Sequence, residues 1–262
     1  MARIPREKYT SGFFHIMIQG INKEYIFKTK EDKEYFLFFM RKYYQDYKIR
    51  MIAYCIMDNH VHFIIYSENI GEISSYMHKI NTIYAKYYNN KYNRIGYVFR
   101  DRYKSQYIYD RDYLFKCIKY IHLNPVKAKI VDKEEKYKYS SYQDFINKKG
   151  YIDNYIIKLI FGTEDYIKLF NKIDDIDIEI MDLENDEQNF ENAINNYLKT
   201  NDLSIKEIIS SKEFLYDFIS KLISKGYKQK QIANKLEISS SKISKIIKKK
   251  SYPHFGNFNP RP

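Results

Sequence analysis

The sequence predicts an α+β domain followed by a small all-α domain. Short apolar segments of strand length alternate with longer amphipathic segments between residues 13 and 125. A second, lysine-rich block with helical spacing occupies residues 206–250. An acidic stretch lies between the two, and a change of charge of this kind is typical of a domain boundary.

The first 108 residues are expected to follow the order strand, helix, two strands, helix, strand. The expected strands are 13–20, 49–57, 61–66 and the latter part of 97–108, and the expected helices are 31–47 and 73–88. The pair Asp58-Asn59 suits a tight hairpin turn between the second and third strands. This order matches the split βαβ, ferredoxin-like arrangement with an antiparallel sheet. Which strands are neighbours is not fixed by the order alone.

A further helix is expected to end before Pro125, because proline biases Asn124 away from helical geometry. Leucine and isoleucine form the apolar stripe of this helix. Tyr120 and Asn124 are four residues apart and therefore share one face. Tyr120 is expected at the border of the stripe, where a tyrosine can have its ring packed and its hydroxyl presented to solvent or substrate. The chain has 29 tyrosines, so an ordinary packing role is the alternative.

Two histidines stand at the start of the third expected strand. His60 and His62 are separated by one residue, so their side chains point to the same face. Two imidazoles aimed at one spot form half of a divalent metal site, and a third ligand must come from elsewhere in the chain. Two hydrogen-bonded strand histidines without a metal would give the same pattern.

The charge is divided unevenly along the 262 residues. Residues 1–150 carry 28 basic and 16 acidic side chains (+12), residues 151–210 carry 5 and 14 (−9), and residues 211–262 carry 12 and 3 (+9). Basic blocks rich in tyrosine are typical of nucleic-acid binders, although a solvated basic surface is an alternative. No apolar run has the length of a membrane span, so a cytoplasmic protein is expected. Cys55 and Cys117 lie in apolar segments and are expected to be reduced.

Three segments taken together resemble a known family. They are the His-hydrophobe-His segment 57–63, the basic segment 99–105 and the helix 119–128, which reads Lys-Tyr-Ile-His-Leu-Asn-Pro-Val-Lys-Ala. Over roughly residues 8–145, the chain closely resembles the single-tyrosine HUH transposases, and specifically the branch of REP-associated tyrosine transposases. Both main motifs occur in the expected order and at the expected separation.

The resemblance implies DNA cleavage and rejoining in DNA transposition or repeat-element mobilisation. Tyr120 would be the nucleophile, His60 and His62 the metal ligands and Asn124 the third, amide-oxygen ligand. The substrate would be single-stranded or hairpin DNA, held through a 5′-phosphotyrosine link, with Mg²⁺ or Mn²⁺ as the divalent metal. Such proteins act as monomers or dimers, so a homodimer is possible. A nucleoid-associated location in bacterial cytoplasm is expected.

Two sets of residues are expected to contact DNA. In the basic segment, backbone contacts and base stacking are expected from Arg100, Arg102, Tyr103 and Lys104, with Tyr97 and Phe99 as further stacking candidates. Residues 231–247 have the spacing of a helix-turn-helix, which would present Ser240, Ser241, Lys242, Ser244 and Lys245 to the major groove of duplex DNA. An ordinary helical hairpin is the alternative for this segment.

The expected domain organisation has four parts: a catalytic domain (1–150), a helical extension with an acidic linker (151–205), a helix-turn-helix domain (206–250) and a flexible tail (251–262). Two other functions fit parts of the pattern. One is a non-catalytic, sequence-specific DNA-binding regulator that retains the fold. The other is a metal hydrolase that uses the two histidines with an activated water.

Overall fold

The computed structural model describes residues 11–108, 111–162, 166–172, 187–224, 227 and 229–249. The chain divides into two compact units, one within Met1–Asp174 and the other within Asp175–Phe258. The expected tail and residues 173–186 of the expected acidic linker lie outside the described residues.

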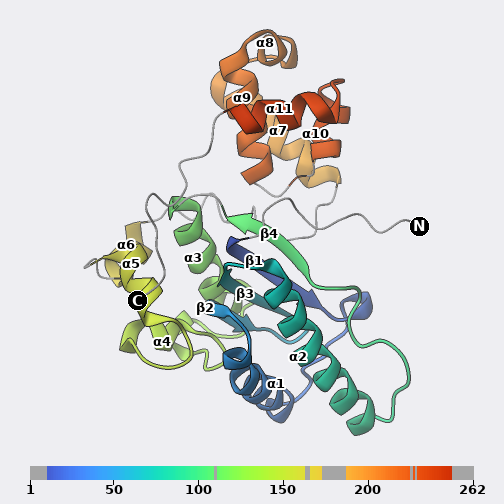
Figure 1. The fold of residues 1–262 in the computed structure, drawn as a ribbon, viewed down its shortest axis with the longest axis vertical. Coiled ribbons are helices and arrows are strands. Elements are labelled where there is room, and N and C mark those ends of the chain that lie inside the picture. Colours follow the sequence, from blue (N-terminus) through green and yellow to red (C-terminus); the bar gives the residue numbers. More distant parts are fainter. Residues whose placement is uncertain are drawn as a thin grey trace. The chain divides into compact units, whose positions relative to one another are not determined.

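The N-terminal unit is built on one four-stranded sheet (Figure 1). Its strands are β1 (Gly12–Gln19), β2 (Ile49–Ile56), β3 (His60–Ser67) and β4 (Lys104–Ile108). They are antiparallel and lie in the order β2-β3-β1-β4. The hairpin expected at Asp58-Asn59 is confirmed, because the backbone N–H of Met57 donates to the carbonyl of His60 at 2.8 Å. The α+β class and the order of elements expected from the sequence are therefore confirmed.

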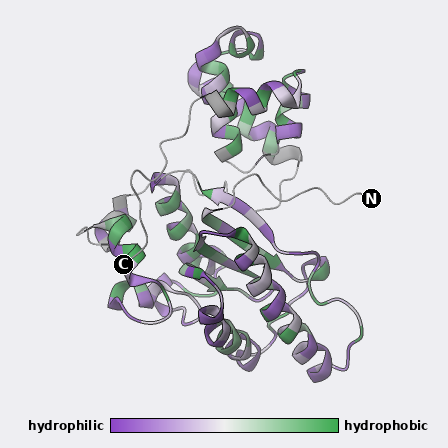
Figure 2. Ribbon diagram, in the orientation of Figure 1, coloured by the Kyte–Doolittle hydropathy of each residue, from purple (hydrophilic) through white to green (hydrophobic). Residues whose placement is uncertain are grey.

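Two helices pack together against one face of this sheet. They are α1 (Lys30–Tyr43) and α2 (Ile70–Lys91), and Figure 1 shows them side by side. Helix α1 begins with a capping box, in which the side chains of Thr29 and Asp32 each accept a hydrogen bond from the other's backbone N–H. The rings of Phe36 in α1 and Phe63 in β3 lie 6.4 Å apart. In Figure 2, hydrophobic colouring is concentrated in the strands that these helices cover.

Helix α3 (Arg111–Lys127) contacts β2 and β3. The expectation that this helix ends before Pro125 is wrong, because Pro125 lies inside it. The proline stands in the last turn, and the backbone beyond it is still paired: the N–H of Ala128 donates to the carbonyl of Asn124 at 2.9 Å. A proline near a helix end removes one backbone hydrogen bond but does not prevent the final turn from closing.

Short helices extend the N-terminal unit beyond α3. They are α4 (Tyr142–Asn147), α5 (Asn154–Phe161) and α6 (Tyr166–Lys172), and three single-turn 3₁₀ helices occur at Ile21–Lys23, Tyr44–Asp46 and Glu134–Lys136. Aromatic rings join them, since Phe161 in α5 lies 4.5 Å from Phe115 in α3 and 5.7 Å from Tyr166 in α6. Of the segment 151–205, the described residues up to 172 belong to the N-terminal unit and those from 187 onward belong to the C-terminal unit.

The C-terminal unit is entirely helical in its described residues. It contains α7 (Glu187–Asn201), α8 (Ile205–Ser210), α9 (Lys212–Ser224), α10 (Gln229–Lys235) and α11 (Ser240–Lys249). Its core includes Phe190 and Ile194 of α7, Phe218 of α9 and Ile243 of α11. Helix α7 thus belongs to this unit because its apolar stripe packs there. Among the helices described, none combines the length and the apolarity that crossing a membrane requires.

Candidate active site

Two histidines lie next to each other on the sheet face that α3 covers. His60 and His62 begin β3, and strand alternation sends both side chains to this face. Their ring centroids are 4.8 Å apart and their planes are nearly perpendicular, at 84°. The first expectation about the site, that the two imidazoles converge, therefore agrees with the geometry.

Tyr120 of α3 lies against this pair. Its ring centroid is 5.5 Å from that of His62, with the planes at 86°. The side chain is only 3% exposed, so of the two settings considered for the hydroxyl, solvent or substrate, open solvent does not apply. The sequence pattern describes the apolar stripe of an isolated helix. In the structure α3 packs against β2 and β3, and residues at the border of the stripe are buried as well.

A third imidazole, which the sequence reasoning missed, completes the cluster. His15 of β1 lies with its ring centroid 5.1 Å from that of His62, nearly parallel to it at 16°. Its Nε2 is 2.9 Å from Nδ1 of His62. The antiparallel register pairs His15 with Ile64 and Met17 with His62, which places His15 on the same sheet face.

Burial keeps the inner imidazoles uncharged. It lowers the pKa of His15 to about 3. Burial is also the main reason that the pKa of His62 lies well below its ordinary value, with further lowering from the neighbouring His60 and His15. A neutral imidazole has a lone pair for a metal ion, and a protonated one has none.

The orientation of both expected ligands suits a bound cation. Nε2 of His62 is buried and has no hydrogen-bond partner in the described part of the chain. Nδ1 of His60 lies 2.6 Å from the amide oxygen of Asn59. That oxygen can only accept, so the proton belongs to Nδ1 of His60 and the lone pair to Nε2. The buried Nε2 of His62, which has no hydrogen-bond partner among the described residues, fits a divalent metal site at this position.

Asn124 stands one turn beyond Tyr120 on α3. It is buried, and its side-chain N–H donates to the carbonyl of Tyr120 at 2.9 Å, which leaves the amide oxygen outside that bond. No three His, Cys, Asp or Glu side chains among the described residues form a ready metal cluster. A metal ion held by His60 and His62 would need a third ligand of another type, and an amide oxygen with two imidazoles is a donor set that Mn²⁺ or Mg²⁺ accepts.

A lysine side chain near Tyr120 was not expected from the sequence. Nζ of Lys127 lies 5.4 Å from the centroid of the Tyr120 ring. Lys127 is exposed and follows Tyr120 by seven residues, which is two turns on the same helix. The spacing alone could have identified it.

The expected DNA contacts of the basic segment separate into two groups. Arg100 and Arg102 are exposed, and Lys104 pairs with Met17 on the same sheet face as His62. Tyr103 is only 7% exposed, so its ring is not available for stacking on a base in this conformation. Tyr97, by contrast, is 85% exposed.

The expected groove-facing residues all lie on α11. Ser240, Ser241, Lys242 and Lys245 are exposed, whereas Ser244 is half-buried and lies 2.9 Å from the side-chain oxygen of Gln229 in α10. Residues 236–239 connect α10 to α11. The polar face of α11 is thus turned away from the core residue Ile243.

His122, on the same helix as Tyr120, has different neighbours. It is fully buried, with one ring nitrogen 2.6 Å from the hydroxyl of Tyr166 and the other 2.8 Å from that of Ser141. Burial lowers its pKa to about 3. Both ring nitrogens of His122 therefore have hydrogen-bond partners of their own, Tyr166 and Ser141.

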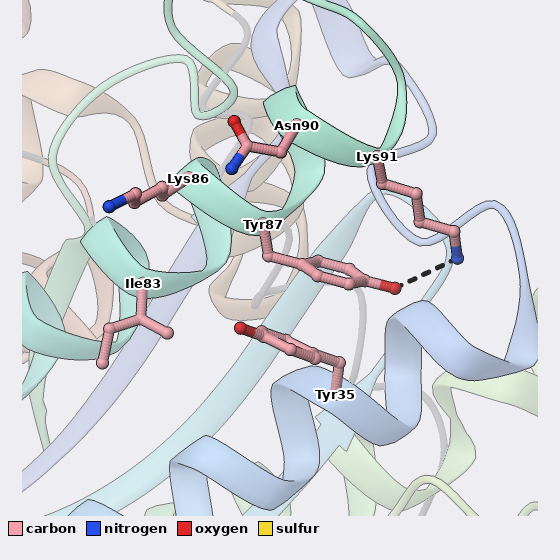
Figure 3. A pocket seen from close by; sticks show the side chains of 6 residues that line it. All are labelled: Tyr35, Ile83, Lys86, Tyr87, Asn90 and Lys91. Atoms are coloured by element: carbon pink, nitrogen blue, oxygen red, sulfur yellow. Dashed lines mark hydrogen bonds between the residues drawn. The ribbon is translucent and has the colours of Figure 1, made fainter.

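A surface hollow lies between α1 and α2, on the other face of the sheet. Figure 3 shows Tyr35 of α1 stacked against Tyr87 of α2, with the side chains of Lys86, Asn90 and Lys91 around them. Its lining contains no carboxylate, imidazole or thiol. We therefore place no catalytic chemistry there.

Comparisons with known proteins bear on this site. Residues 8–124 match the family model described as "Transposase IS200 like". A solved structure of a REP-associated tyrosine transposase bound to a REP hairpin shares 17% sequence identity with this chain. It has a TM-score of 0.47 and covers 59% of this chain and 90% of that chain. No curated protein gives a significant match. The segment that matches the model of IS200-like transposases contains the histidine pair, Tyr120 and Asn124.

Proposed function

We propose that the chain is a metal-dependent DNA strand transferase that nicks and rejoins single-stranded hairpin DNA. Tyr120 would be the nucleophile, and His60, His62 and Asn124 would hold a divalent ion, Mg²⁺ or Mn²⁺. The match of residues 8–124 to the model of IS200-like transposases supports a transposase-type enzyme. The observation that carries the proposal is the placement of the Tyr120 ring 5.5 Å from His62, whose buried Nε2 has no partner in the described residues.

The chemistry is a transesterification. The phenolic oxygen of Tyr120 forms a bond to phosphorus, the bond from phosphorus to the 3′ oxygen breaks, and that oxygen takes a proton as the phenol releases one. The product is a 5′-phosphotyrosine and a free 3′-OH, which can reverse the step without a nucleotide cofactor. When bound, a divalent ion would offset the charge on the phosphate and orient it for in-line attack.

The protein has groups suited to guiding the DNA strand to this site. Arg100 and Arg102 are exposed, and Lys104 lies on the sheet face of the histidine pair. Their charges would attract phosphates without reading sequence. Lys127 stands over the ring of Tyr120 and is exposed, so its flexible side chain can move aside when the strand enters.

The C-terminal unit would be a separate duplex-binding module of the helix-turn-helix type. Its supporting features are α10, the short connection 236–239 and α11, with exposed serine and lysine on the outer face of α11 and Ile243 in the core. A recognition helix presents its N-terminal residues to base edges, and Ser240 and Ser241 occupy that position here. A homodimer would bring two such modules to adjacent half-sites.

One assay tests the nucleophile. The protein is incubated with single-stranded hairpin oligonucleotides and Mg²⁺ or Mn²⁺, and denaturing gels then reveal any covalent protein–DNA adduct. Wild type is expected to form an adduct that Tyr120→Phe abolishes. Tyr113→Phe is the matched control, since Tyr113 is a buried tyrosine two turns earlier on α3.

Other outcomes identify the competing functions. Binding of the hairpin without any adduct or nick across the set of oligonucleotides would favour the non-catalytic regulator. Strand cleavage that survives Tyr120→Phe would favour a hydrolase in which a metal-activated water replaces the phenol.

A further inference from the structure

We propose that His15 is a positioning residue for the metal site. It would accept a hydrogen bond from Nδ1 of His62 and thereby fix the lone pair of His62 on Nε2, where the divalent ion binds. This inference rests on the proposed function, because it assigns the ion to Nε2 of His62. His15 itself would not touch the ion or the DNA.

The short contact between the two rings can hold only one proton. Nε2 of His15 and Nδ1 of His62 are 2.9 Å apart, so one nitrogen donates and the other accepts. The two remaining nitrogens, Nδ1 of His15 and Nε2 of His62, are both buried without a partner in the described residues. Whichever nitrogen donates, one N–H and one lone pair remain unpaired.

Counting hydrogen bonds therefore does not select the tautomer, but a site preorganised in the metal-free protein to bind a cation at Nε2 of His62 must keep the proton on Nδ1. If His15 donated, His62 would carry its proton on Nε2 and could not bind a cation there. If His62 donates, its Nε2 keeps the lone pair. Ligating histidines generally donate their other ring N–H to a neighbouring acceptor in this way.

The other expected ligand shows the same arrangement with a different partner. Nδ1 of His60 donates to the amide oxygen of Asn59 at 2.6 Å, which fixes its lone pair on Nε2. Asn59 belongs to the hairpin before β3, whereas His15 belongs to the neighbouring strand β1. Two separate acceptors would thus orient the two imidazoles so that both present Nε2.

The position of His15 suits this role. It is fully buried on a central strand, and its ring is stacked on that of His62 at 16°. A buried, stacked ring has little freedom, so it would hold His62 in one orientation and one tautomer. Loss of such an outer-shell partner typically costs about 10- to 100-fold in metal affinity.

The tautomer can be read without any metal. Full-length, metal-free protein labelled with ¹⁵N-histidine is examined by long-range ¹H–¹⁵N NMR, and a His62→Gln variant assigns the His62 signals by their loss. We expect the Nδ1–H form of His62. A signal pattern of the Nε2–H form in wild type would overturn the inference whether or not the protein is an enzyme.

Metal affinity gives the second readout. Mn²⁺ binding is measured by EPR titration for wild type, His15→Leu and His15→Gln, and thermal unfolding without metal records the stability of each. His15→Leu is expected to bind about 10- to 100-fold more weakly. His15→Gln should recover most of the affinity, because its amide oxygen can accept the same hydrogen bond.

A matched control separates positioning from simple loss of a buried ring. His122→Leu removes another fully buried imidazole from the same unit and should leave Mn²⁺ affinity unchanged. If His15→Leu binds as tightly as wild type while His62→Gln does not bind, the inference fails and the proposed metal site stands. If wild type itself does not bind Mn²⁺, the metal assignment in the proposed function fails, and this inference fails with it.

Discussion

The carboxylate of Asp32 joins α1 to α2, and we expect Asp32→Asn to destabilise the N-terminal unit without changing the chemistry of Tyr120. The Asp32 side chain has no exposed surface. It accepts four hydrogen bonds: from the backbone of Thr29 at 2.9 Å, from Nζ of Lys91 at 2.7 Å, and from the hydroxyls of Tyr92 and Tyr87 at 2.7 and 3.0 Å. All four donors converge on one buried group.

The expected loss in the free energy of unfolding follows from how these hydrogen bonds are divided between the two carboxylate oxygens. Oδ1 receives Lys91 and Tyr87, and Oδ2 receives the Thr29 backbone and Tyr92. Asparagine keeps one oxygen and turns an NH₂ group toward the other two donors, so two bonds to a charged acceptor are lost whichever way it faces. Each such bond contributes about 1.5–3 kcal/mol. The Lys91 side chain is 30% exposed and can recover hydration, so we expect a total of about 2–4 kcal/mol.

Native-state hydrogen exchange provides the assay, because peptides from β1 and β3 report the opening free energy of the N-terminal unit alone. Glu34→Gln is the control. It changes a carboxylate on the same helix that is 54% exposed and binds Lys138 at 2.7 Å, and it should cost less than about 1 kcal/mol. If the two substitutions lowered the opening free energy equally, the reasoning about the buried hydrogen-bond network would be refuted.

The same carboxylate predicts a pH dependence. Burial alone would raise the pKa of Asp32, but hydrogen bonds from Lys91, Tyr92, Thr29 and Tyr87 outweigh it and bring the pKa below its ordinary value of 3.8. A carboxyl with a lowered pKa in the folded state stabilises the protein above its unfolded pKa, and this contribution is lost as the pH falls through the folded pKa. The stability difference between wild type and Asp32→Asn should therefore shrink below pH 3.8. A constant difference down to full protonation would contradict this.

Three further outcomes test other parts of the molecule. Ile243→Ala, which truncates a fully buried side chain of α11, should cost about 2–5 kcal/mol in thermal unfolding of the C-terminal unit and weaken duplex binding. Lys242→Ala and Lys245→Ala should each reduce the salt slope of duplex binding by about 1 in fluorescence anisotropy, with Ser210→Ala as a control outside α11. In wild type, His122 should make the free energy of unfolding rise with pH between about 3 and 6.5, because its imidazole is protonated in the unfolded chain and neutral in the folded one. His122→Gln should reduce this slope by up to about 1.4 kcal/mol per pH unit in pH-dependent denaturation.

Local patterns were enough to predict much of the N-terminal fold. The strands, the hairpin at Asp58-Asn59 and the shared face of His60 and His62 all follow from side-chain alternation and turn chemistry, which act within a few residues. The burial of Cys55 and Cys117 follows from the same kind of pattern, since both lie in apolar segments.

Features that depend on tertiary contacts could not be predicted from these patterns. The proximity of His15 to His62 depends on the register between β1 and β3. The two residues are 47 positions apart in the sequence, so they meet only after the sheet has formed. The burial of Tyr120 depends on how α3 crosses the sheet. In the same way, α7 belongs to the C-terminal unit because Phe190 and Ile194 pack in a core made largely of residues after position 206.

The placement of Tyr120 and Asn124 on one helix has a mechanical consequence. Residues four apart on a helix have Cβ atoms about 5–6 Å from each other, and the hydrogen bond from the Asn124 amide to the Tyr120 carbonyl fixes them further. A shift of α3 over β2 and β3 would therefore move the proposed nucleophile and the proposed third ligand together, while His60 and His62 remain on the sheet. The helix fixes the backbone spacing between the two residues, and the distance that can change more readily is the one between helix and sheet.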